Sequence, residues 1–466
     1  MTSKADNPPP RAPLPFSPPA PHQKTYHPIY SAPEEVPSTP FRPSLIIAMG
    51  GILYLLAGIL AICSPVVSSV LLPGPDDQHQ YKIAVADIEL IDTMRKDPHS
   101  QDEDRKIMVS LFMPVPVANC AKEVERPYMS SPAAIIADFQ MLGDTPVGVF
   151  DKIAYTVCSS GNSPINMSDI PVVVLEPHTD TSRLLYANLA RYMTANNVAV
   201  VLIDHPYDSS VVEFPDKSVV YQNGATGLSN YSPLMEWNST VETAVSIRIA
   251  DIKFALSQLG DASKVTKNFP DFQFSGTLNT TGYSVVGHGL GGTVATSLST
   301  EDPNVIISIN LSGSAPPLNH TSAAPIFFIG RSDFRRNNDI LWPSFWTHLT
   351  GPATEFDLAN SGIMDFTDLP IVVEASNRRG LKGHGVGESG AAGNHAIQCF
   401  VEGILADNLH NNDGGVRNCI HIFGDRMAPY MLGRPMEAID KRSSAKSRRS
   451  NVAAAWRHTM ENWGFL

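Results

Sequence analysis

The sequence lacks both a surplus of basic residues and the short motifs of several enzyme classes. Its formal net charge is -12, whereas binding to nucleic-acid phosphates needs a basic surface. No Walker A, H-E-x-x-H or C-x-x-C pattern occurs, so nothing predicts a nucleotide, zincin or thioredoxin-type site. We therefore expect no nucleic-acid partner, no metal and no other cofactor, and no motif identifies a protein partner.

Cysteine is also scarce, with 5 in 466 residues. One of them, Cys63, lies in an apolar run, and the other four are Cys120, Cys158, Cys399 and Cys419. These four could form two disulfides in an oxidising compartment or remain buried free thiols. The cysteines alone leave both alternatives open.

Large apolar residues are rare in residues 1–42, which contain 12 of the 38 prolines. Such a segment cannot bury enough apolar surface to offset the entropy lost on ordering. We therefore expect a disordered, Pro-rich tail over 1–42, with a ligand for a PxxP-binding domain as the alternative.

Charge is absent from Ser44 to Leu72, and most of that segment is apolar. A helix needs about 20 such residues to cross a bilayer, so we predict a single transmembrane helix, a signal anchor, over 43–72. A cleaved signal peptide and a buried core helix are the alternatives. Arg42 precedes the segment and Asp76 follows it. Because positive residues favour the cytoplasmic side, we expect a cytoplasmic N-terminus and a lumenal or extracellular main domain.

N-x-S/T motifs agree with that topology. One of them, at Asn310, ends a predicted buried strand and is excluded. The remaining candidate glycosylation sites are Asn166, Asn230, Asn238, Asn279 and Asn319. A basic tail over 431–466, with KRSSAKSRRS from Lys441, could contact anionic lipid headgroups or remain solvated.

Strand and helix patterns alternate from residue 80 to residue 430 without a linker. Val172–Glu176 and Val198–Asp204 are continuous apolar runs, typical of strands covered on both faces. Val241–Leu259 has apolar residues at helical spacing. This alternation predicts one α/β domain over 80–430, with a doubly wound, mostly parallel sheet.

A glycine-rich turn follows the predicted strand Tyr283–Val286 and precedes a predicted helix. Strand, tight turn and helix are the context of a nucleophile elbow, G-x-S-x-G. Here the turn reads GHGLGG from Gly287, and its central residue, Gly289, has no side chain. The sequence therefore predicts the scaffold of a serine hydrolase without the attacking hydroxyl group.

Several segments, together with this turn, resemble the platelet-activating-factor acetylhydrolases over roughly residues 80–410. They are Asp87–Pro98, Ile107–Pro114, Arg183–Tyr186, DHPYDSSVVEFPD from Asp204, Arg248 with Asp251, and Ile309–Gly313. The resemblance implies an α/β-hydrolase fold. It also implies descent from metal-independent esterases that remove short sn-2 acyl groups from phospholipids, and hence a phospholipid or ester ligand.

Carrying the family's catalytic triad over to this sequence places no functional side chain at any of its three positions. Gly289 stands at the nucleophile, Ser312 at the acid and Ile363 at the base. A triad needs a hydroxyl, an imidazole that removes its proton, and an acid that orients the imidazole. Because all three are missing, the resemblance predicts a degenerate triad.

The oxyanion-hole positions implied by the resemblance are Leu290 and Thr179. The family's glycine-rich loop aligns with Pro177–Thr181, which contains no glycine. Three histidines, His178, His205 and His288, follow or end three predicted strands. Because ligands bind at the carboxyl edge of α/β sheets, these histidines are candidates for a relocated base or metal site.

Three functional hypotheses follow from these residues. The first is a membrane-anchored pseudoenzyme that keeps a scaffold for lipids or esters. The alternative is an active carboxylic ester hydrolase that cleaves short sn-2 acyl groups through relocated residues. A third, weaker alternative is a relic without a present role.

Overall fold

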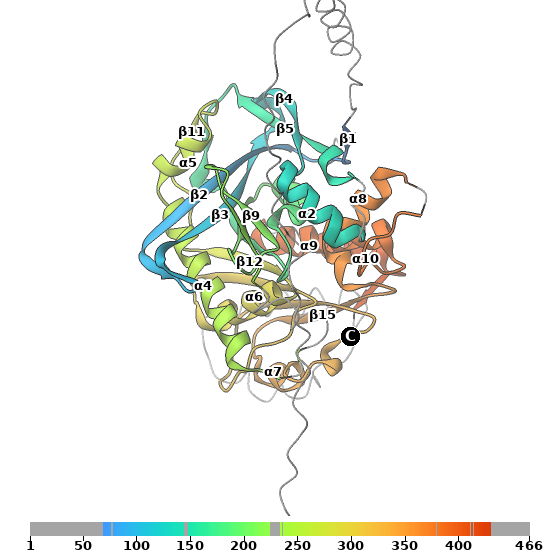
Figure 1. Ribbon diagram of the computed structural model, residues 1–466. Coiled ribbons are helices and arrows are strands. Elements are labelled where there is room, and N and C mark those ends of the chain that lie inside the picture. Colours follow the sequence, from blue (N-terminus) through green and yellow to red (C-terminus); the bar gives the residue numbers. More distant parts are fainter. Residues whose placement is uncertain are drawn as a thin grey trace, which may run out of the picture. The chain divides into compact units, whose positions relative to one another are not determined.

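The computed structural model of this protein describes residues 69–429, except 76–77, 144–147, 224–233, 235, 379, 411 and 413. All of these residues belong to a compact unit that begins at Val67 (Figure 1). The predicted tails over 1–42 and 431–466 lie outside the described residues. So does most of the predicted membrane helix.

The last residues of that predicted helix form a strand. Val70–Leu71 is β1, and it pairs in parallel with β5 (Ile153–Gly161). The neighbouring Leu72 is 2% exposed and donates its main-chain N–H to the carbonyl of Ala154. The prediction of a helix through residue 72 is therefore wrong at its C-terminal end, because this segment pairs with the domain. Within the described ranges, no helix is long and apolar enough to cross a membrane.

A nine-stranded sheet organises the domain, in the order β16-β15-β14-β13-β12-β7-β8-β3-β2. Its strands are β2 (Tyr81–Asp97), β3 (Ser100–Pro116), β7 (Val172–Glu176), β8 (Ala199–Asp204), β12 (Tyr283–His288), β13 (Val305–Leu311), β14 (Ile326–Arg331), β15 (Ala353–Leu358) and β16 (Met427–Pro429). The strands from β15 to β8 are parallel, while the β2–β3 hairpin and β16 pair antiparallel at the two edges. The prediction of a mostly parallel α/β sheet is thus confirmed.

Helices cover both faces of this sheet because its central strands are apolar on both sides. On β7, Val173 and Leu175 pack into one apolar core, and Val172 and Val174 pack into the other. The first core also includes residues of α2, α3, α8 and α9, and the second includes residues of α4, α5 and α6 (Figure 1). The helices are α2 (Ser131–Leu142), α3 (Ala187–Ala195), α4 (Ser239–Leu259), α5 (Ala262–Asn268), α6 (Leu290–Glu301), α7 (Trp342–His348), α8 (Leu369–Ser376), α9 (Gly390–Leu409) and α10 (Gly415–Phe423).

Smaller strands lie outside the main sheet. β4 (Cys120–Pro127) and β1 flank β5 in a three-stranded sheet. Two further pairs are β6 (Ile165–Asn166) with β11 (Phe274–Ser275), and β9 (Val211–Glu213) with β10 (Val219–Tyr221). Disulfides join Cys120 of β4 to Cys158 of β5, and Cys399 of α9 to Cys419 of α10. Each disulfide therefore links two neighbouring elements.

Candidate functional site: a nucleophile elbow without a nucleophile

The elbow is built at the carboxyl edge of the sheet, where β12 ends at His288 and α6 begins at Leu290. Gly289 joins them with φ 55° and ψ -118°, a backbone conformation that strains residues with a side chain. At Gly291, a β-carbon would lie 2.4 Å from the carbonyl oxygen of Glu176, so only glycine fits against β7. The chain thus keeps the tight strand–turn–helix geometry of a nucleophile elbow.

The imidazole of His178 occupies the space above the elbow. A β-carbon placed on Gly289 would lie 2.8 Å from Cγ of His178 and 3.0 Å from its Cδ2 and Nδ1. Real β-carbons essentially never approach other heavy atoms to less than 3.0 Å. His178 follows β7 by two residues and is 0% exposed. The space that a nucleophilic side chain would need is therefore filled by this ring.

A second imidazole packs beside the first. The rings of His178 and His288 meet edge to face, with centroids 5.0 Å apart. Nδ1 of His288 is hydrogen-bonded to the Tyr186 hydroxyl (2.8 Å), which also accepts the His178 main-chain N–H (2.9 Å). On its other side His288 stacks on Phe366, with centroids 5.4 Å apart. Burial, then the charges of His178 and Arg331, hold the pKa of His288 well below 6.5, so this ring is neutral at physiological pH.

At the acid position, Ser312 is paired with a cation. Its Oγ is hydrogen-bonded to Nη1 of Arg331, whose Nε donates to Asp333 at 2.6 Å. Arg331 is 2% exposed, and Ser312 is 4% exposed. A triad acid stabilises the imidazolium that forms during catalysis. A buried guanidinium at this position would destabilise such a cation.

At the base position, Ile363 is the first residue of the 3-10 helix η6 (Ile363–Phe366) and is 7% exposed. Phe366, at the other end of η6, stacks on His288 beside the elbow. A β-carbon on Gly313, next to Ser312, would lie 2.2 Å from the carbonyl oxygen of Gly289. Gly313 thus lies against Gly289, and Phe366 brings η6 to His288. Position 289 has no hydroxyl, Ser312 has no carboxylate and Ile363 has no imidazole.

The two oxyanion-hole positions differ in what they retain. Leu290 is the first residue of α6, where a main-chain N–H has no partner within the helix. The side chain of Thr179 donates to Oδ1 of Asp208 at 2.6 Å, and Thr179 is 0% exposed. The main-chain donor position at Leu290 is therefore kept. The loop Pro177–Thr181, which would supply the second donor, carries bulky side chains in place of glycines.

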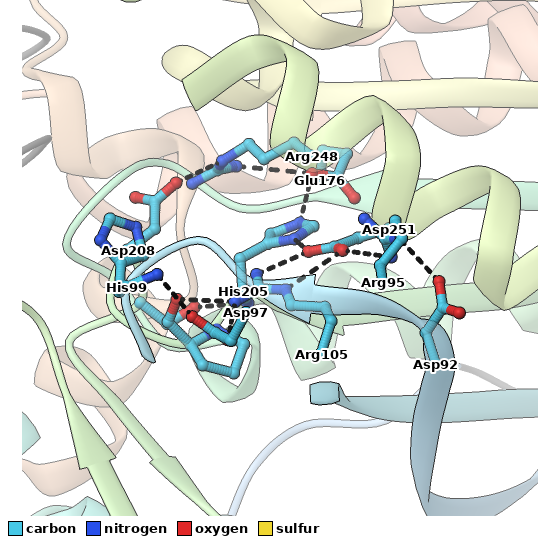
Figure 2. Close-up of polar contacts among 12 residues, drawn as sticks. Asp92, Arg95, Asp97, His99, Arg105, Glu176, His205, Asp208, Arg248 and Asp251 are labelled. Atoms are coloured by element: carbon cyan, nitrogen blue, oxygen red, sulfur yellow. Dashed lines mark hydrogen bonds and ion pairs between the residues drawn. The ribbon is translucent and has the colours of Figure 1, made fainter. Parts of the chain in front are cut away.

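The third candidate histidine, His205, belongs to a separate network of buried charges (Figure 2). Its Nδ1 lies 2.9 Å from Asp251, and its Nε2 lies 2.9 Å from Glu176. Burial alone would lower its pKa, but the charge of Glu176 and hydrogen bonds with Asp251 and Glu176 raise it to about 9. His205 is therefore an imidazolium that joins β7, β8 and α4.

Arginines flank this imidazolium on both sides in Figure 2. Arg105 contacts Asp251 at 2.7 Å and Asp97 at 2.8 Å, and Arg248 contacts Asp208 at 2.6 Å. Burial would raise the pKa of Asp208, but Arg248 outweighs it and lowers that pKa to about 2. Because these charges are paired and buried, the network fixes the strand ends and leaves His205 no free nitrogen for a substrate.

The structure therefore brings two of the three candidate histidines together. His178 and His288 meet at the elbow, while His205 is engaged by Glu176 and Asp251. Among the residues that the structure describes, no three or more His, Cys, Asp or Glu side chains form a group able to hold a metal ion. Sequence reasoning missed Tyr186, Phe366 and Arg331 as neighbours of the elbow, because each lies far from it in the chain.

Comparisons with known proteins report on the family and the fold. The family model described as "Platelet-activating factor acetylhydrolase, isoform II" matches residues 149–412. The chain is 26% identical over 384 residues to a "Probable 1-alkyl-2-acetylglycerophosphocholine esterase" of Arthroderma benhamiae, covering 76% of this chain and 92% of that protein. A solved structure of a ferulic acid esterase from Streptomyces cinnamoneus is similar, with a TM-score of 0.57, 22% identity, and coverage of 73% of this chain and 94% of that one. The last similarity shows an esterase-like α/β fold.

Proposed function

The chain belongs to the platelet-activating factor acetylhydrolase isoform II family, and on that premise we propose that it is a non-hydrolytic member, a pseudoenzyme. One observation carries the proposal: the His178 ring lies where the side chain of a nucleophile at position 289 would have to be. Position 178 carries the side chain that fills this space, and position 289 carries none. A serine introduced at position 289, with no other change, would overlap the His178 ring.

The surroundings of the elbow support the same proposal. His288 is buried, neutral and hydrogen-bonded to Tyr186. Ser312 is paired with Arg331, and Ile363 cannot accept a proton. Loss of the nucleophile or the base alone costs about 10⁶ in turnover in a model serine protease. None of the three positions carries the side chain that its role in a serine triad needs, which supports a non-hydrolytic protein.

The alternative proposal is an active carboxylic ester hydrolase acting through relocated residues. Two observations favour it: a relative is named a probable esterase, and two imidazoles lie side by side at the elbow. In that case His178 would be the nucleophile or base, with the Leu290 N–H as an oxyanion donor. The two proposals differ in whether hydrolysis depends on His178.

Hydrolysis assays separate them. The substrates are p-nitrophenyl acetate and a 1-alkyl-2-acetyl phospholipid, and the proteins are the wild-type chain and His178→Gln. A fluorophosphonate probe reports independently on an activated hydroxyl. Saturable turnover lost in His178→Gln supports the esterase, while background rates in both proteins support the pseudoenzyme.

A membrane anchor with a lumenal or extracellular domain is also part of the proposal. Four of the predicted glycosylation sites, Asn166, Asn238, Asn279 and Asn319, are exposed, and Asn230 lies outside the described residues. Asn310 is 0% exposed and bonds to α6 through Gly292 and Thr296. The accessible sites and the two disulfides support an oxidising, glycosylating compartment. A bound phospholipid or ester is the ligand that the family suggests for the scaffold.

A further inference from the structure

The loop Pro177–Thr181 closes the elbow. It places the His178 ring over Gly289, and the residues around that space are nearly inaccessible, since His178 and Thr179 are 0% exposed and Leu290 is 2% exposed. The residues of the loop belong to no helix or strand. Contacts with neighbouring elements therefore set the position of the His178 ring.

One buried ion pair restrains this loop on both sides of His178. Nη1 of Arg248, on α4, donates to the carbonyl of Pro177 at 2.7 Å, immediately before the histidine. Nε of the same guanidinium donates to Asp208 at 2.6 Å. Asp208 in turn accepts the hydroxyl of Thr179 at 2.6 Å, immediately after the histidine. The pair of Arg248 and Asp208 thus holds the residue before His178 and the residue after it.

These attachments are charged and shielded from water. Arg248 is 1% exposed and Asp208 is 7% exposed, and Figure 2 shows Arg248 between Asp208 and Glu176. Burial would raise the pKa of Asp208, but Arg248 outweighs it and lowers that pKa to about 2, so the pair stays ionised at physiological pH. Hydrogen bonds with an ionised partner are roughly twice as strong as neutral ones.

Other attachments of the loop to the rest of the domain are neutral. The Tyr186 hydroxyl accepts the main-chain N–H of His178 at 2.9 Å, and Gln140 of α2 donates to the carbonyl of Asp180 at 2.6 Å. The bond from Thr181 to the His178 carbonyl lies within the loop and would move with it. The charged contacts of the loop therefore come from the pair of Arg248 and Asp208.

We propose that the Arg248–Asp208 pair is a lock that keeps the His178 ring in the space above Gly289. Both are positioning residues, because they act on the elbow through the loop. Breaking the pair releases the loop and gives solvent access to the two imidazoles at the elbow. A ligand that uses the elbow must displace this loop, so the pair also controls access to the site. The lock rests on the proposed function, since it governs the same elbow, but its readout involves no hydrolysis.

Footprinting with diethyl pyrocarbonate, which modifies accessible neutral imidazoles, tests the lock on the purified full chain at pH 7. Mass spectrometry gives the rate of modification at His178. A buried side chain reacts only when its surroundings open locally. In Arg248→Met the rate is expected to rise at least ~10-fold over the wild type, because the charged bonds to the loop are lost. A protected His178 in this folded variant would overturn the lock.

A second pair of variants covers the case in which Arg248→Met does not fold, since it leaves a buried carboxylate unpaired. Thr179→Val removes the hydroxyl that binds Asp208 and keeps the side-chain shape, whereas Thr179→Ser keeps the hydroxyl. His178 should be modified about 10-fold faster in Thr179→Val, because its bond has a charged partner, and at the wild-type rate in Thr179→Ser. Equal rates in these two variants would contradict the lock.

The matched control is Arg336→Met. Arg336 is also buried and ion-paired, with Glu355 at 3.1 Å, so its loss tests whether weakening any buried ion pair exposes His178. The control should keep the wild-type rate, and a rate as fast as in Arg248→Met would refute a specific lock. Protection of His178 in all variants refutes the lock whatever the hydrolysis assays show. Hydrolysis by the wild type refutes the pseudoenzyme and leaves the lock standing.

Discussion

A β-carbon added to Gly289 would lie 2.8 Å from Cγ of His178. The two positions therefore share one space at the elbow, and only one of them can carry a side chain without movement of the other. Position 289 is where an α/β-hydrolase carries its nucleophile, and the ring of His178 fills the space that a side chain there would occupy. The first prediction tests this coupling.

Gly289→Ser is expected to lower the free energy of unfolding by about 1–3 kcal/mol. The serine would have to adopt a positive φ, and its β-carbon would overlap the His178 ring. Adding His178→Gly removes the overlap, so the double variant should lose less than the sum of the two single variants. Urea unfolding measures the free energy of unfolding of the two single variants and of the double variant. The matched control is Gly390→Ser, since Gly390 has a φ of 52° and open space around its β-carbon position. Additive losses in the double variant would contradict a shared space.

His205 predicts a loss of stability at alkaline pH. Its pKa in the folded protein is raised to about 9, above the ordinary value of about 6.5. The stabilisation is therefore complete below pH 6.5 and is lost as pH rises through 9. The shift corresponds to a contribution on the order of 3 kcal/mol. Unfolding free energies between pH 6 and 10 measure it.

His205→Gln should flatten this alkaline slope, although the variant is less stable throughout because Glu176 and Asp251 each lose one of their cationic partners. His410→Gln, at an exposed position, is the control and should keep the wild-type slope. An unchanged slope in His205→Gln would show that another group titrates.

His288 predicts the opposite dependence in acid. Its pKa in the folded protein is well below 6.5, because it is buried beside His178 and Arg331. Protons therefore bind the unfolded chain more readily, and stability falls as pH drops below 6.5. His288→Phe keeps an aromatic ring without the proton site, so its acid slope between pH 6.5 and 4.5 should be shallower than that of the wild type. Equal slopes would mean that the pKa of His288 does not differ between the folded and the unfolded chain.

Glycosylation tests the proposed topology. Expressed in a secretory system, the chain should shift in mobility after endoglycosidase treatment, and glutamine at Asn166, Asn238, Asn279 or Asn319 should remove part of the shift at each occupied site. Asn304→Gln is the control, because Asn304 is exposed but is not followed by the N-x-S/T pattern. A chain with no shift at all would contradict a lumenal domain.

The fold could be predicted from the sequence where apolar runs were continuous. Val172–Glu176 and Val198–Asp204 became β7 and β8 with a one-residue difference, because buried strands need apolar residues on both faces. The sheet of β4 and β5 was missed because residues of β4 such as Lys122 and Glu123 are exposed and leave no apolar pattern.

The vacant triad positions could be predicted from the family's motifs, but their neighbours could not. His178 and Gly289 are distant in sequence, and only the pairing of β7 with β12 brings them together. The same is true of Arg331 and Ser312, which meet because β14 pairs with β13. The one available signal was the absence of glycine from Pro177–Thr181, since a bulky residue there must occupy space that a hydrolase leaves open.

The most direct test of the account is the rate of ester hydrolysis by the purified full chain. With p-nitrophenyl acetate and a 1-alkyl-2-acetyl phospholipid, the account predicts rates equal to the buffer background. It also predicts no fluorophosphonate labelling, for the wild type and His178→Gln alike. Saturable turnover by the wild type that disappears in His178→Gln would contradict it and identify His178 as a catalytic residue.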